Sequence, residues 1–342
     1  MQTYFELLRN LNNNGKVYSP RNIPVKELIN EHLEIPSNRC LISIPGIRDV
    51  IDPTTKEGKY LRAEFVWYMS KNLDTNYISN YTNVWSKIVN PAYPEFKDRQ
   101  NCVNSNYGYA IFRNVFDIRD TFIHSTNNNM KYIYYLHYVL YCLSNDEFSR
   151  QAIIPYTDNV IYNNGVRDFT CTQNQHFLIR DNKLYSIVCL RSSDAIKGLT
   201  FDIPWWSFVS QLVAQYFDIN EINLSVNIGS SHYYMSDSKL VDDILANNNT
   251  LFKLNLKPID YICQAVNTIL PKSEFEFISF INNEFKRKIS KDVVNYDKYI
   301  YFIMTLNNIL YAFNYHVNNR SRSSLEQQIE INNFLFDSSF EY

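Results

Sequence analysis

Apolar and polar positions along the chain separate two helical regions from a central region with a different pattern. Apolar side chains at helical spacing predict a helix over residues 61–72 and a second, buried helix over 131–143. From about 256 to 318 the pattern is again mostly helical, and the tail from 319 is polar. The predicted helices therefore lie before residue 143 and after about residue 256, and the segment between them has a pattern that is not helical throughout.

The central segment has the composition of β-strands. Runs at 176–180 and 184–190 are rich in β-forming residues and flank the polar turn Asp181–Lys183, which predicts an antiparallel hairpin. Residues 150–155 predict a further strand, and so do residues 222–229. Helices and strands together indicate an α/β chain.

The hairpin predicts a contact between a thiol and a guanidinium. Cys171 lies about ten residues before the turn and Arg191 about nine after it, and such positions end side by side in an antiparallel pair. Downstream, Asp202 is expected to cap a helix that has Pro204 in its first turn and continues through Phe217. Glycine is rare, with seven in the chain, so the backbone is expected to need special geometry at three of them: Gly108, Gly198 and Gly229.

Composition and charge narrow the class of protein. The 342 residues are 45% hydrophobic and 20% charged, enough apolar material for the core of one large α/β domain with insertions. The net charge of −2 argues against nucleic-acid binding, so an anionic ligand would need a local arginine cluster. The chain has no apolar run approaching the roughly 20 residues that cross a bilayer.

Cysteine spacing argues against a metal site. The six cysteines form no Cys-x-x-Cys pair and no Cys/His pair at metal-ligand spacing. A zinc site and a disulfide framework are therefore not expected, and a reducing compartment fits best. With no signal-like N-terminus, we expect a soluble, cytoplasmic protein that binds no membrane.

The stretch from Cys171 to Asp202 resembles the thymidylate synthase family. It contains Cys171–Thr172, the phrase FLIRDNKLYSIVCLRSSD and the run Gly198–Asp202, and Gly229-x-x-His232-x-Tyr234 follows at the right distance. Other segments resemble the family in the same order along the chain: Ser19–Arg21, Ala63–Trp67 around Glu64, Trp85, Asn106–Gly108 with Tyr107, and Ser149–Arg150. The resemblance covers roughly residues 15–235.

The resemblance implies a fold and an assembly. The family fold is a mixed sheet with helices on one face, and two copies stack their sheets as a homodimer in which Arg150 would act across the interface. Residues 1–240 would form the catalytic core. Residues 241–342, which do not resemble the family's C-terminal closing segment, would form a helical extension that can belong to the same domain.

It also implies roles for particular side chains. Cys171 would be the nucleophile that attacks carbon 6 of a pyrimidine, Glu64 would move protons, and Asp202 would contact the base. The remaining expectations are a 5′-phosphate held by Arg21, Arg150, Arg191 and Ser192, a sugar hydroxyl bound by His232 and Tyr234, Asp194 between pyrimidine and folate, and Trp85 and Tyr107 along the folate and nucleotide sides. His176 is given no role.

Each residue also has a structural interpretation that the sequence leaves open. Cys171 can be a buried structural thiol, the arginines can form surface salt bridges, and Glu64 can be an exposed helical carboxylate. Asp202 and Asp194 can be a helix cap and a loop residue. The aromatic residues and His232 can simply pack in a core.

Three departures from ordinary thymidylate synthases resemble phage-type pyrimidine hydroxymethylases. Thr172 follows the cysteine where the family has histidine, Gln151 replaces the second of two arginines, and Asp202 replaces the asparagine that binds the pyrimidine edge. Cytosine presents an unprotonated ring nitrogen and an amino donor. A carboxyl that holds a proton can donate to the first and accept from the second.

The favoured hypothesis is therefore a deoxycytidylate 5-hydroxymethyltransferase that uses 5,10-methylenetetrahydrofolate as cosubstrate and no metal. Its partners would be a pyrimidine nucleoside monophosphate, folate and a second copy of the chain, and a phage protein would act in the host cytoplasm. The open alternatives are a dUMP hydroxymethylase, a thymidylate synthase and a CMP hydroxymethylase. Outside catalysis, the alternative is a nucleotide-binding sensor with the same fold.

Overall fold

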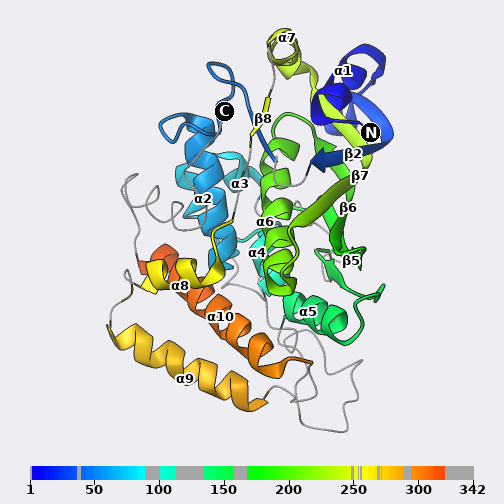
Figure 1. The fold of residues 1–342 in the computed structure, drawn as a ribbon. Coiled ribbons are helices and arrows are strands. Elements are labelled where there is room, and N and C mark those ends of the chain that lie inside the picture. The colour runs from blue at the N-terminus through cyan, green and yellow to red at the C-terminus, as the bar shows by residue number, and fades with distance from the viewer. Residues whose placement is uncertain are drawn as a thin grey trace.

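The structure is a computed structural model (Figure 1). It describes residues 2–36, 40–88, 101–112, 134–157, 168–247, 250–252, 254, 256–267, 270, 272–288 and 294–319. Within these residues, no helix is long and apolar enough to cross a membrane.

A six-stranded mixed sheet forms the centre of the molecule. Its strand order is β1-β2-β7-β6-β5-β4, and β6 and β7 are parallel while the other neighbours are antiparallel. The strands are β1 Lys16–Tyr18, β2 Val25–Pro36, β4 Ile153–Pro155, β5 Thr172–Arg180, β6 Lys183–Asp194 and β7 Glu221–Tyr234. A separate pair joins β3 Leu41–Ser43 to β8 Thr250–Phe252. The predicted hairpin is β5–β6, and the predicted strand over 150–155 is the shorter β4.

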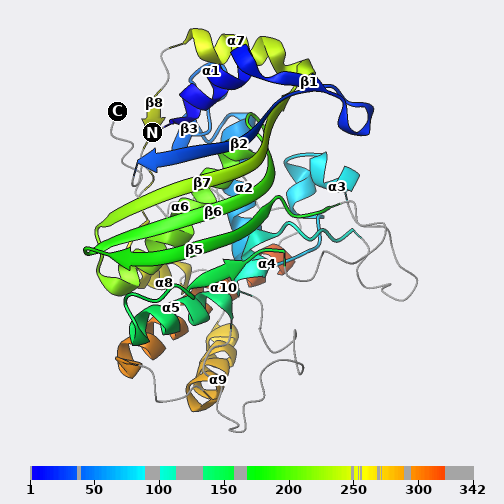
Figure 2. The ribbon, with the colours of Figure 1, turned by 90° about the vertical axis from the view of Figure 1, so that its right-hand side faces the viewer.

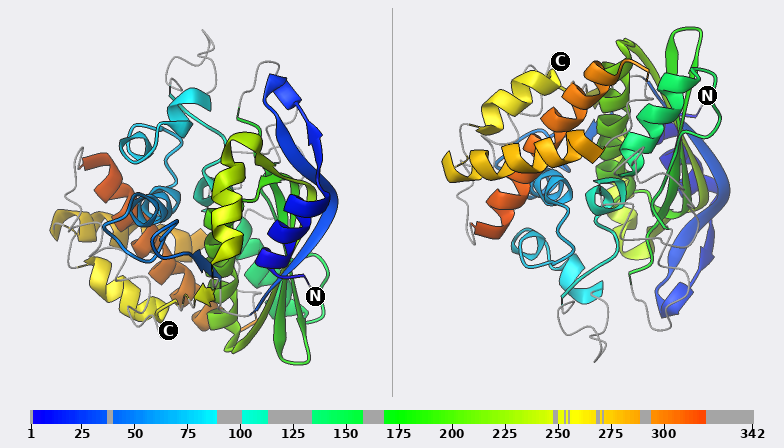
Figure 3. Two further views of the ribbon diagram at one scale, coloured as in Figure 1. Left: turned by 90° about the horizontal axis from the view of Figure 1, so that it is seen from above. Right: turned by 90° about the horizontal axis from the view of Figure 1, so that it is seen from below.

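Helices cover one face of this sheet. The crossover between the parallel strands β6 and β7 is α6, Leu199–Phe217, whose side chains are almost all buried. Figure 2 shows the sheet in front with α6 and α2 (Lys56–Ser70) behind it, and Figure 3 shows the same layers from above and below. No described helix lies over the front face in Figure 2. A mixed sheet with helices on one face is therefore confirmed.

The remaining helices surround this layer. They are α1 Tyr4–Asn14, α3 Val84–Ile88, α4 Tyr107–Phe112, α5 Tyr135–Asn145, α7 Ser238–Ala246, α8 Ile259–Asn267, α9 Lys272–Lys288 and α10 Tyr296–Asn319. Within the described ranges, short 3₁₀ turns span Pro20–Asn22, Ile78–Asn80 and Met235–Asp237. The helical character predicted for 256–318 is confirmed by α8 to α10. Of the helix predicted over 131–143, residues 131–133 lie outside the described residues and the rest lies largely in α5.

Two helix starts differ from the prediction. α2 begins at Lys56 and not at 61, because the Thr55 side chain accepts a hydrogen bond from the Gly58 N–H and caps the first turn. α6 begins at Leu199, because the Gly198 carbonyl accepts from the Phe201 and Asp202 N–H groups at 2.9 and 3.0 Å. Asp202 therefore lies inside the first turn and is not the cap. The ring of Pro204 removes only one helical hydrogen bond.

The C-terminal helices pack onto the helix that contains Glu64. The Asn314 side chain on α10 donates to the Ser70 carbonyl at the end of α2, at 2.6 Å. Tyr299, Ile303 and Leu306 are fully buried and belong to the same hydrophobic cluster as the residues between α2 and α6. The core therefore extends continuously from the sheet through α2 to α10.

Candidate active site

The predicted contact between Cys171 and Arg191 is present at the end of the β5–β6 hairpin. The Arg191 N–H donates to the Cys171 carbonyl at 3.0 Å, and Arg191 Nη2 lies 3.6 Å from Cys171 Sγ. A register shift between Thr172 and Asn174 inserts one extra residue into β5. This bulge brings the two side chains together even though one more residue separates Cys171 from the turn.

The thiol is held mainly in its protonated form. Burial raises the pKa of Cys171 to about 11, and the nearby Asp202 and Asp168 carboxyls raise it as well. Arg191 and Arg21 lower it, but their effect is smaller than that of burial. Arg191 therefore favours the thiolate, but its effect on the pKa of Cys171 is smaller than the effect of burial.

Arg191 is oriented by the backbone that precedes the cysteine. Its guanidinium donates to the Thr170 carbonyl at 3.2 Å and to the Phe169 carbonyl at 2.5 Å. Next to them, the buried Asp168 carboxyl accepts hydrogen bonds from the Ser105 N–H at 2.7 Å and the Ser105 hydroxyl at 2.6 Å. Asp168 therefore joins the segment before the cysteine to the segment before α4, a role that the sequence analysis missed.

Glu64 is a buried carboxyl on α2. Burial raises its pKa to about 7, although hydrogen bonds from Tyr60 and Tyr68 lower it. The Tyr60 hydroxyl donates to Glu64 Oε1 at 2.6 Å. Burial in apolar surroundings raises the pKa of a carboxyl in this way, and at neutral pH the group can both give and take a proton.

Asp202 on α6 lies in the same buried region. Its pKa is raised well above the ordinary value, first by burial and then by the charge of Glu64, and the Tyr107 hydroxyl is within hydrogen-bonding reach of it. α4, which begins at Tyr107, approaches α2 closely: a Cβ at Gly108 would lie 1.7 Å from the Tyr68 carbonyl oxygen. Glycine at 108 is therefore what brings Tyr107 close to both carboxyls.

The segment Gly229-x-x-His232-x-Tyr234 lies on β7, beside the β5–β6 hairpin. His232 pairs with Asp194 in the parallel register, and the Ala195 N–H donates to the His232 carbonyl at 2.7 Å. The rings of His232 and Tyr234 are 5.8 Å apart, on the same side of the strand, because side chains two residues apart in a strand share a face. Among the described residues, nothing forms a hydrogen bond with His232 Nδ1, which leaves a polar atom for a ligand.

Asp194 and Ser192 complete this edge of the sheet. Asp194 Oδ1 accepts from the Ile196 and Lys197 N–H groups at 2.8 and 2.9 Å and so shapes the loop into α6. Ser192 pairs with Ser230 on β7. A Cβ at Gly229 would lie 2.7 Å from the Arg191 carbonyl oxygen, so glycine allows β7 to approach Arg191. Gly108, Gly198 and Gly229 do not have positive φ angles, and what they supply is close approach.

Arg21 and Arg150, the other two arginines expected to bind the phosphate, lie in different parts of the structure. Arg21 has φ 55° in the turn before β2, and its charge lowers the pKa of Cys171, which places it on the cysteine side of the molecule. Arg150 is exposed just before β4 and forms none of the contacts described above. His176 on β5 pairs with Ile153, and its ring is hydrogen-bonded to the Arg150 backbone.

Trp85 on α3 lies next to the Glu64 region. Its Nε1–H donates to the Tyr60 hydroxyl at 2.9 Å, and its ring lies 4.9 Å from that of Trp67. Tyr60 and Tyr68 are four residues before and after Glu64, a helical spacing that places all three on one face. Tyr68 lies inside the helix predicted over 61–72, whereas Tyr60 lies one residue before it. Among the described residues, no three His, Cys, Asp or Glu side chains gather as a metal site.

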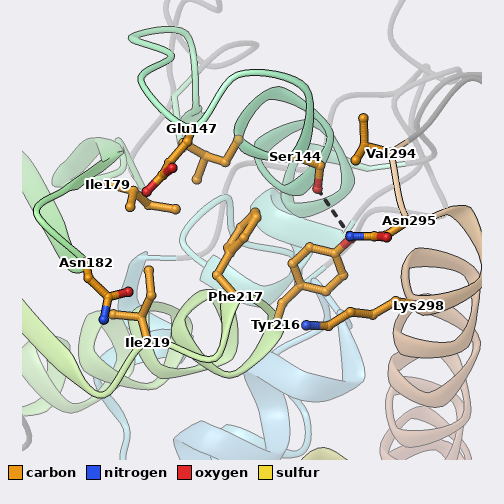
Figure 4. A pocket seen from close by; sticks show the side chains of 11 residues that line it. Ser144, Glu147, Ile179, Asn182, Tyr216, Phe217, Ile219, Val294, Asn295 and Lys298 are labelled. Carbon is orange, nitrogen blue, oxygen red and sulfur yellow. Dashed lines mark hydrogen bonds between the residues drawn. The ribbon is translucent and has the colours of Figure 1, made fainter.

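A hollow of about 350 Å³ lies elsewhere, at the C-terminal end of α6 (Figure 4). Ser144, Tyr216 and Lys298 are among its lining residues, and Tyr216 is hydrogen-bonded to Ser144 at 3.3 Å. None of the residues proposed from the sequence lines it. The candidate chemistry is therefore at the opposite end of the β5–β6 hairpin from this hollow.

The chain is similar in sequence to known proteins. A family model described as thymidylate synthase matches residues 2–294, beyond the stretch of roughly 15–235 that the motifs cover. Deoxycytidylate 5-hydroxymethyltransferases from Enterobacteria phages T4, T2 and T6 are each 28% identical to this chain over 196 residues. The aligned part is 54% of this chain and 70% of each relative.

Proposed function

The chain belongs to the thymidylate synthase family and is a one-carbon transferase, and from this we propose that it converts dCMP to 5-hydroxymethyl-dCMP. The cosubstrate would be 5,10-methylenetetrahydrofolate. The observation that carries the choice of base is the Asp202 carboxyl, whose pKa burial and Glu64 raise well above the ordinary value. The names of the phage relatives support the same substrate. Because those relatives are phage proteins, the proposed place of action is the cytoplasm of a host cell.

A protonated Asp202 fits cytosine when its O–H is held toward the ring nitrogen, and the Tyr107 hydroxyl within hydrogen-bonding reach is the group proposed to hold it so. Its O–H would donate to the unprotonated ring nitrogen, and its carbonyl oxygen would accept from the exocyclic amine. Uracil presents a ring N–H and a carbonyl at these positions, so with the carboxyl held in that same orientation it would leave the buried O–H facing another donor. Such a mismatch inside a buried site costs far more than the loss of one surface hydrogen bond.

Cys171 is the proposed nucleophile. Its sulfur would form a bond to carbon 6 of the ring after losing its proton, which makes carbon 5 nucleophilic. The folate supplies the one-carbon unit that carbon 5 takes up. Overall, dCMP, methylenetetrahydrofolate and water give hydroxymethyl-dCMP and tetrahydrofolate, with the hydroxyl coming from water and the Cys171 sulfur leaving as the product forms.

Glu64 is proposed to handle the protons of this sequence. Its pKa of about 7 lets one group both accept and return a proton near neutral pH. The burial of Glu64 also places it where bulk water would not compete with a water held for the reaction. Trp85 and Tyr107 beside it, with Asp194, are proposed to hold the folate and the nucleotide next to each other.

The 5′-phosphate is proposed to bind where Arg191, Arg21 and Ser192 lie. Several charged donors can hold a dianion even though the net charge of the chain is −2. His232, with its available Nδ1, and Tyr234 would bind the sugar hydroxyl. Arg150 is exposed and outside this group, so we propose that it reaches the site of a second copy in a homodimer formed by the open face of the sheet.

Product mass is the first test. The protein is incubated with methylenetetrahydrofolate and either dCMP, dUMP or CMP, and the nucleotide product is identified by mass spectrometry. A hydroxymethyl adduct on dCMP is the expected result. A methylated product or a preference for dUMP would overturn the proposed reaction or substrate within the same family. A hydroxymethylated product from CMP alone would show that the substrate is the ribonucleotide and not dCMP.

The Cys171→Ser variant separates catalysis from simple binding. It should abolish product while leaving dCMP binding measurable by calorimetry, because the sulfur forms the covalent bond and does not hold the phosphate. If the wild-type protein binds dCMP and yields no product with any of the three nucleotides, a nucleotide-binding protein with this fold becomes the better explanation.

A further inference from the structure

Tyr60 connects two parts of the proposed site that the family motifs leave separate. Its hydroxyl donates to Glu64 Oε1 at 2.6 Å and accepts from the Trp85 indole N–H at 2.9 Å. Both hydrogen bonds are thus made by a single oxygen atom. A hydroxyl that accepts from one neighbour becomes a stronger donor to the next, so the two bonds reinforce each other.

The position of Tyr60 is well defined by its surroundings. It lies one turn before Glu64 on α2, so both side chains share one face of the helix. Its ring packs edge-on against Phe201 at 4.8 Å, one residue before Asp202 on α6. On the other side, Trp85 is held by the ring of Trp67 at 4.9 Å. The hydroxyl therefore has little freedom to leave Glu64.

We propose that Tyr60 is a positioning residue that orients the Glu64 carboxyl for proton transfer and links it, through Trp85, to the folate side of the site. This inference rests on the proposed function, in which Glu64 moves protons and Trp85 contacts folate. Tyr60 itself would not touch the reacting atoms. A change in the position of the Trp85 indole on folate binding would alter the bond from Tyr60 and thereby the proton affinity of Glu64.

The groups that face Glu64 come from three helices. Tyr60 and Tyr68 on α2 are hydrogen-bonded to it and lower its pKa. Asp202 on α6 and Tyr107 on α4 interact with its charge. Removing the Tyr60 hydroxyl takes away one of the two hydrogen bonds that stabilise the charged form, so the pKa of Glu64 should rise.

The test is Tyr60→Phe, which keeps the ring against Phe201 and removes only the hydroxyl. The matched control is Tyr216→Phe, because Tyr216 is also buried and loses one hydrogen bond, to Ser144, far from the site. The Glu64 carboxyl is titrated by ¹³C NMR in protein labelled at glutamate, with its signal assigned by Glu64→Gln. We expect its pKa to rise by roughly 0.5–1 pH unit in Tyr60→Phe and to be unchanged in the control.

Turnover gives a second readout. In Tyr60→Phe, kcat should fall roughly tenfold with the KM for the nucleotide unchanged, and the limb of the pH–rate profile that reports Glu64 should move to higher pH. The direction is the same whether Glu64 acts as acid or base. A Glu64 titration and a pH profile identical to those of the wild type, in a folded Tyr60→Phe protein, would overturn the proposal.

The link to folate is tested without chemistry. With nucleotide bound, tetrahydrofolate, which has no one-carbon unit to transfer, should shift the Glu64 titration in the wild type and shift it less in Tyr60→Phe and in Trp85→Phe. An equal shift in all three proteins, or none in the wild type, would contradict the link. Because the titration needs no turnover, an inactive wild type would refute the proposed function and leave the hydrogen-bond claim to be judged by NMR.

Discussion

Arg191 Nη2 lies 3.6 Å from Cys171 Sγ, and yet burial keeps the pKa of that thiol at about 11. The guanidinium therefore reduces the cost of forming the thiolate without abolishing it. Since a nucleophilic cysteine must react as thiolate, the proton has to leave when the substrate binds.

The pH dependence of alkylation tests this balance. The rate of Cys171 modification by iodoacetamide, followed by peptide mass spectrometry, should still be rising above pH 9, because the thiolate fraction grows up to a pKa of about 11. Arg191→Gln should slow the reaction at pH 8.5 by roughly threefold to tenfold. The control is Arg180→Gln, since Arg180 also donates to backbone carbonyls but lies at the other end of β5. A rate that levels off near pH 7 would contradict a raised pKa.

Asp202→Asn should reverse the choice of base. An amide that directs its carbonyl to the ring N–H and its N–H₂ to the ring carbonyl suits uracil, and in that orientation it offers no donor to the unprotonated ring nitrogen of cytosine. The ratio of kcat/KM for dCMP to that for dUMP should fall by roughly 10²-fold or more. The assay compares both nucleotides in one preparation, so a loss of folded protein cancels from the ratio. An unchanged ratio would show that Asp202 does not contact the base edge.

The same carboxyl predicts a pH dependence of selectivity. The pKa of Asp202 is raised, so the O–H is present below that pKa and is lost as the pH rises through it. Preference for dCMP over dUMP should therefore be greatest at low pH within the stable range and decline on the alkaline side. Competition assays across pH measure this ratio directly.

The buried Glu64 carboxyl should lower the free energy of unfolding at neutral and alkaline pH, where it is ionised. Its pKa is about 7 in the folded protein and 4.5 as the ordinary value, so the folded state binds the proton more tightly than the unfolded state. The contribution of this group to the free energy of unfolding is therefore largest below pH 4.5, and it decreases as the pH rises from 4.5 to about 7. Glu64→Gln should remove this dependence and gain up to about 3 kcal/mol over the wild type at pH 8.

Urea unfolding at pH 5 and pH 8 checks this prediction. Glu221→Gln is the control, because Glu221 is exposed and paired with Lys183 at 2.8 Å. A surface pair of this kind contributes little and should show no such change between the two pH values. If the free energy of unfolding of Glu64→Gln changes between the two pH values as much as that of the wild type, the pKa of Glu64 is not raised in the folded protein.

Arg150 can be tested by mixing inactive variants. If Arg150 acts in the partner's site, Arg150→Ala and Cys171→Ser should each be inactive alone, and random exchange of subunits should restore about a quarter of the wild-type activity. The restored site would combine an intact Cys171 from one copy with an intact Arg150 from the other. No recovery, despite subunit exchange confirmed by native mass spectrometry, would place Arg150 outside the partner's site.

Local patterns were sufficient for the parts of the site that lie near one another along the chain. The turn Asp181–Lys183 and the strands beside it bring Cys171 next to Arg191, since an antiparallel hairpin pairs residues by their distance from the turn. The alternation of side chains along β7 likewise predicts that His232 and Tyr234 share a face. Both relationships follow from backbone geometry that needs no partner from elsewhere in the fold.

Helix boundaries were less accessible from the sequence. The hydrophobic pattern of α2 becomes clear only after its first turn, which is polar and capped by Thr55. The sequence pattern therefore places Tyr60 outside the predicted helix and does not indicate its relation to Glu64. Asp202 was expected as a cap because a proline followed it, whereas the free carbonyl of Gly198 starts α6 one turn earlier.

The sequence determined which chemical groups are present and which of them meet across a hairpin or along a strand, because those relationships depend on short-range backbone geometry. Only the tertiary structure decided that Glu64 on α2, Tyr107 on α4 and Asp202 on α6 share one buried region, and that Trp85 reaches Glu64 through Tyr60. Their pKa values depend on burial and on charges from distant segments. Those quantities exist only after the helices have packed, since no single stretch of sequence contains them.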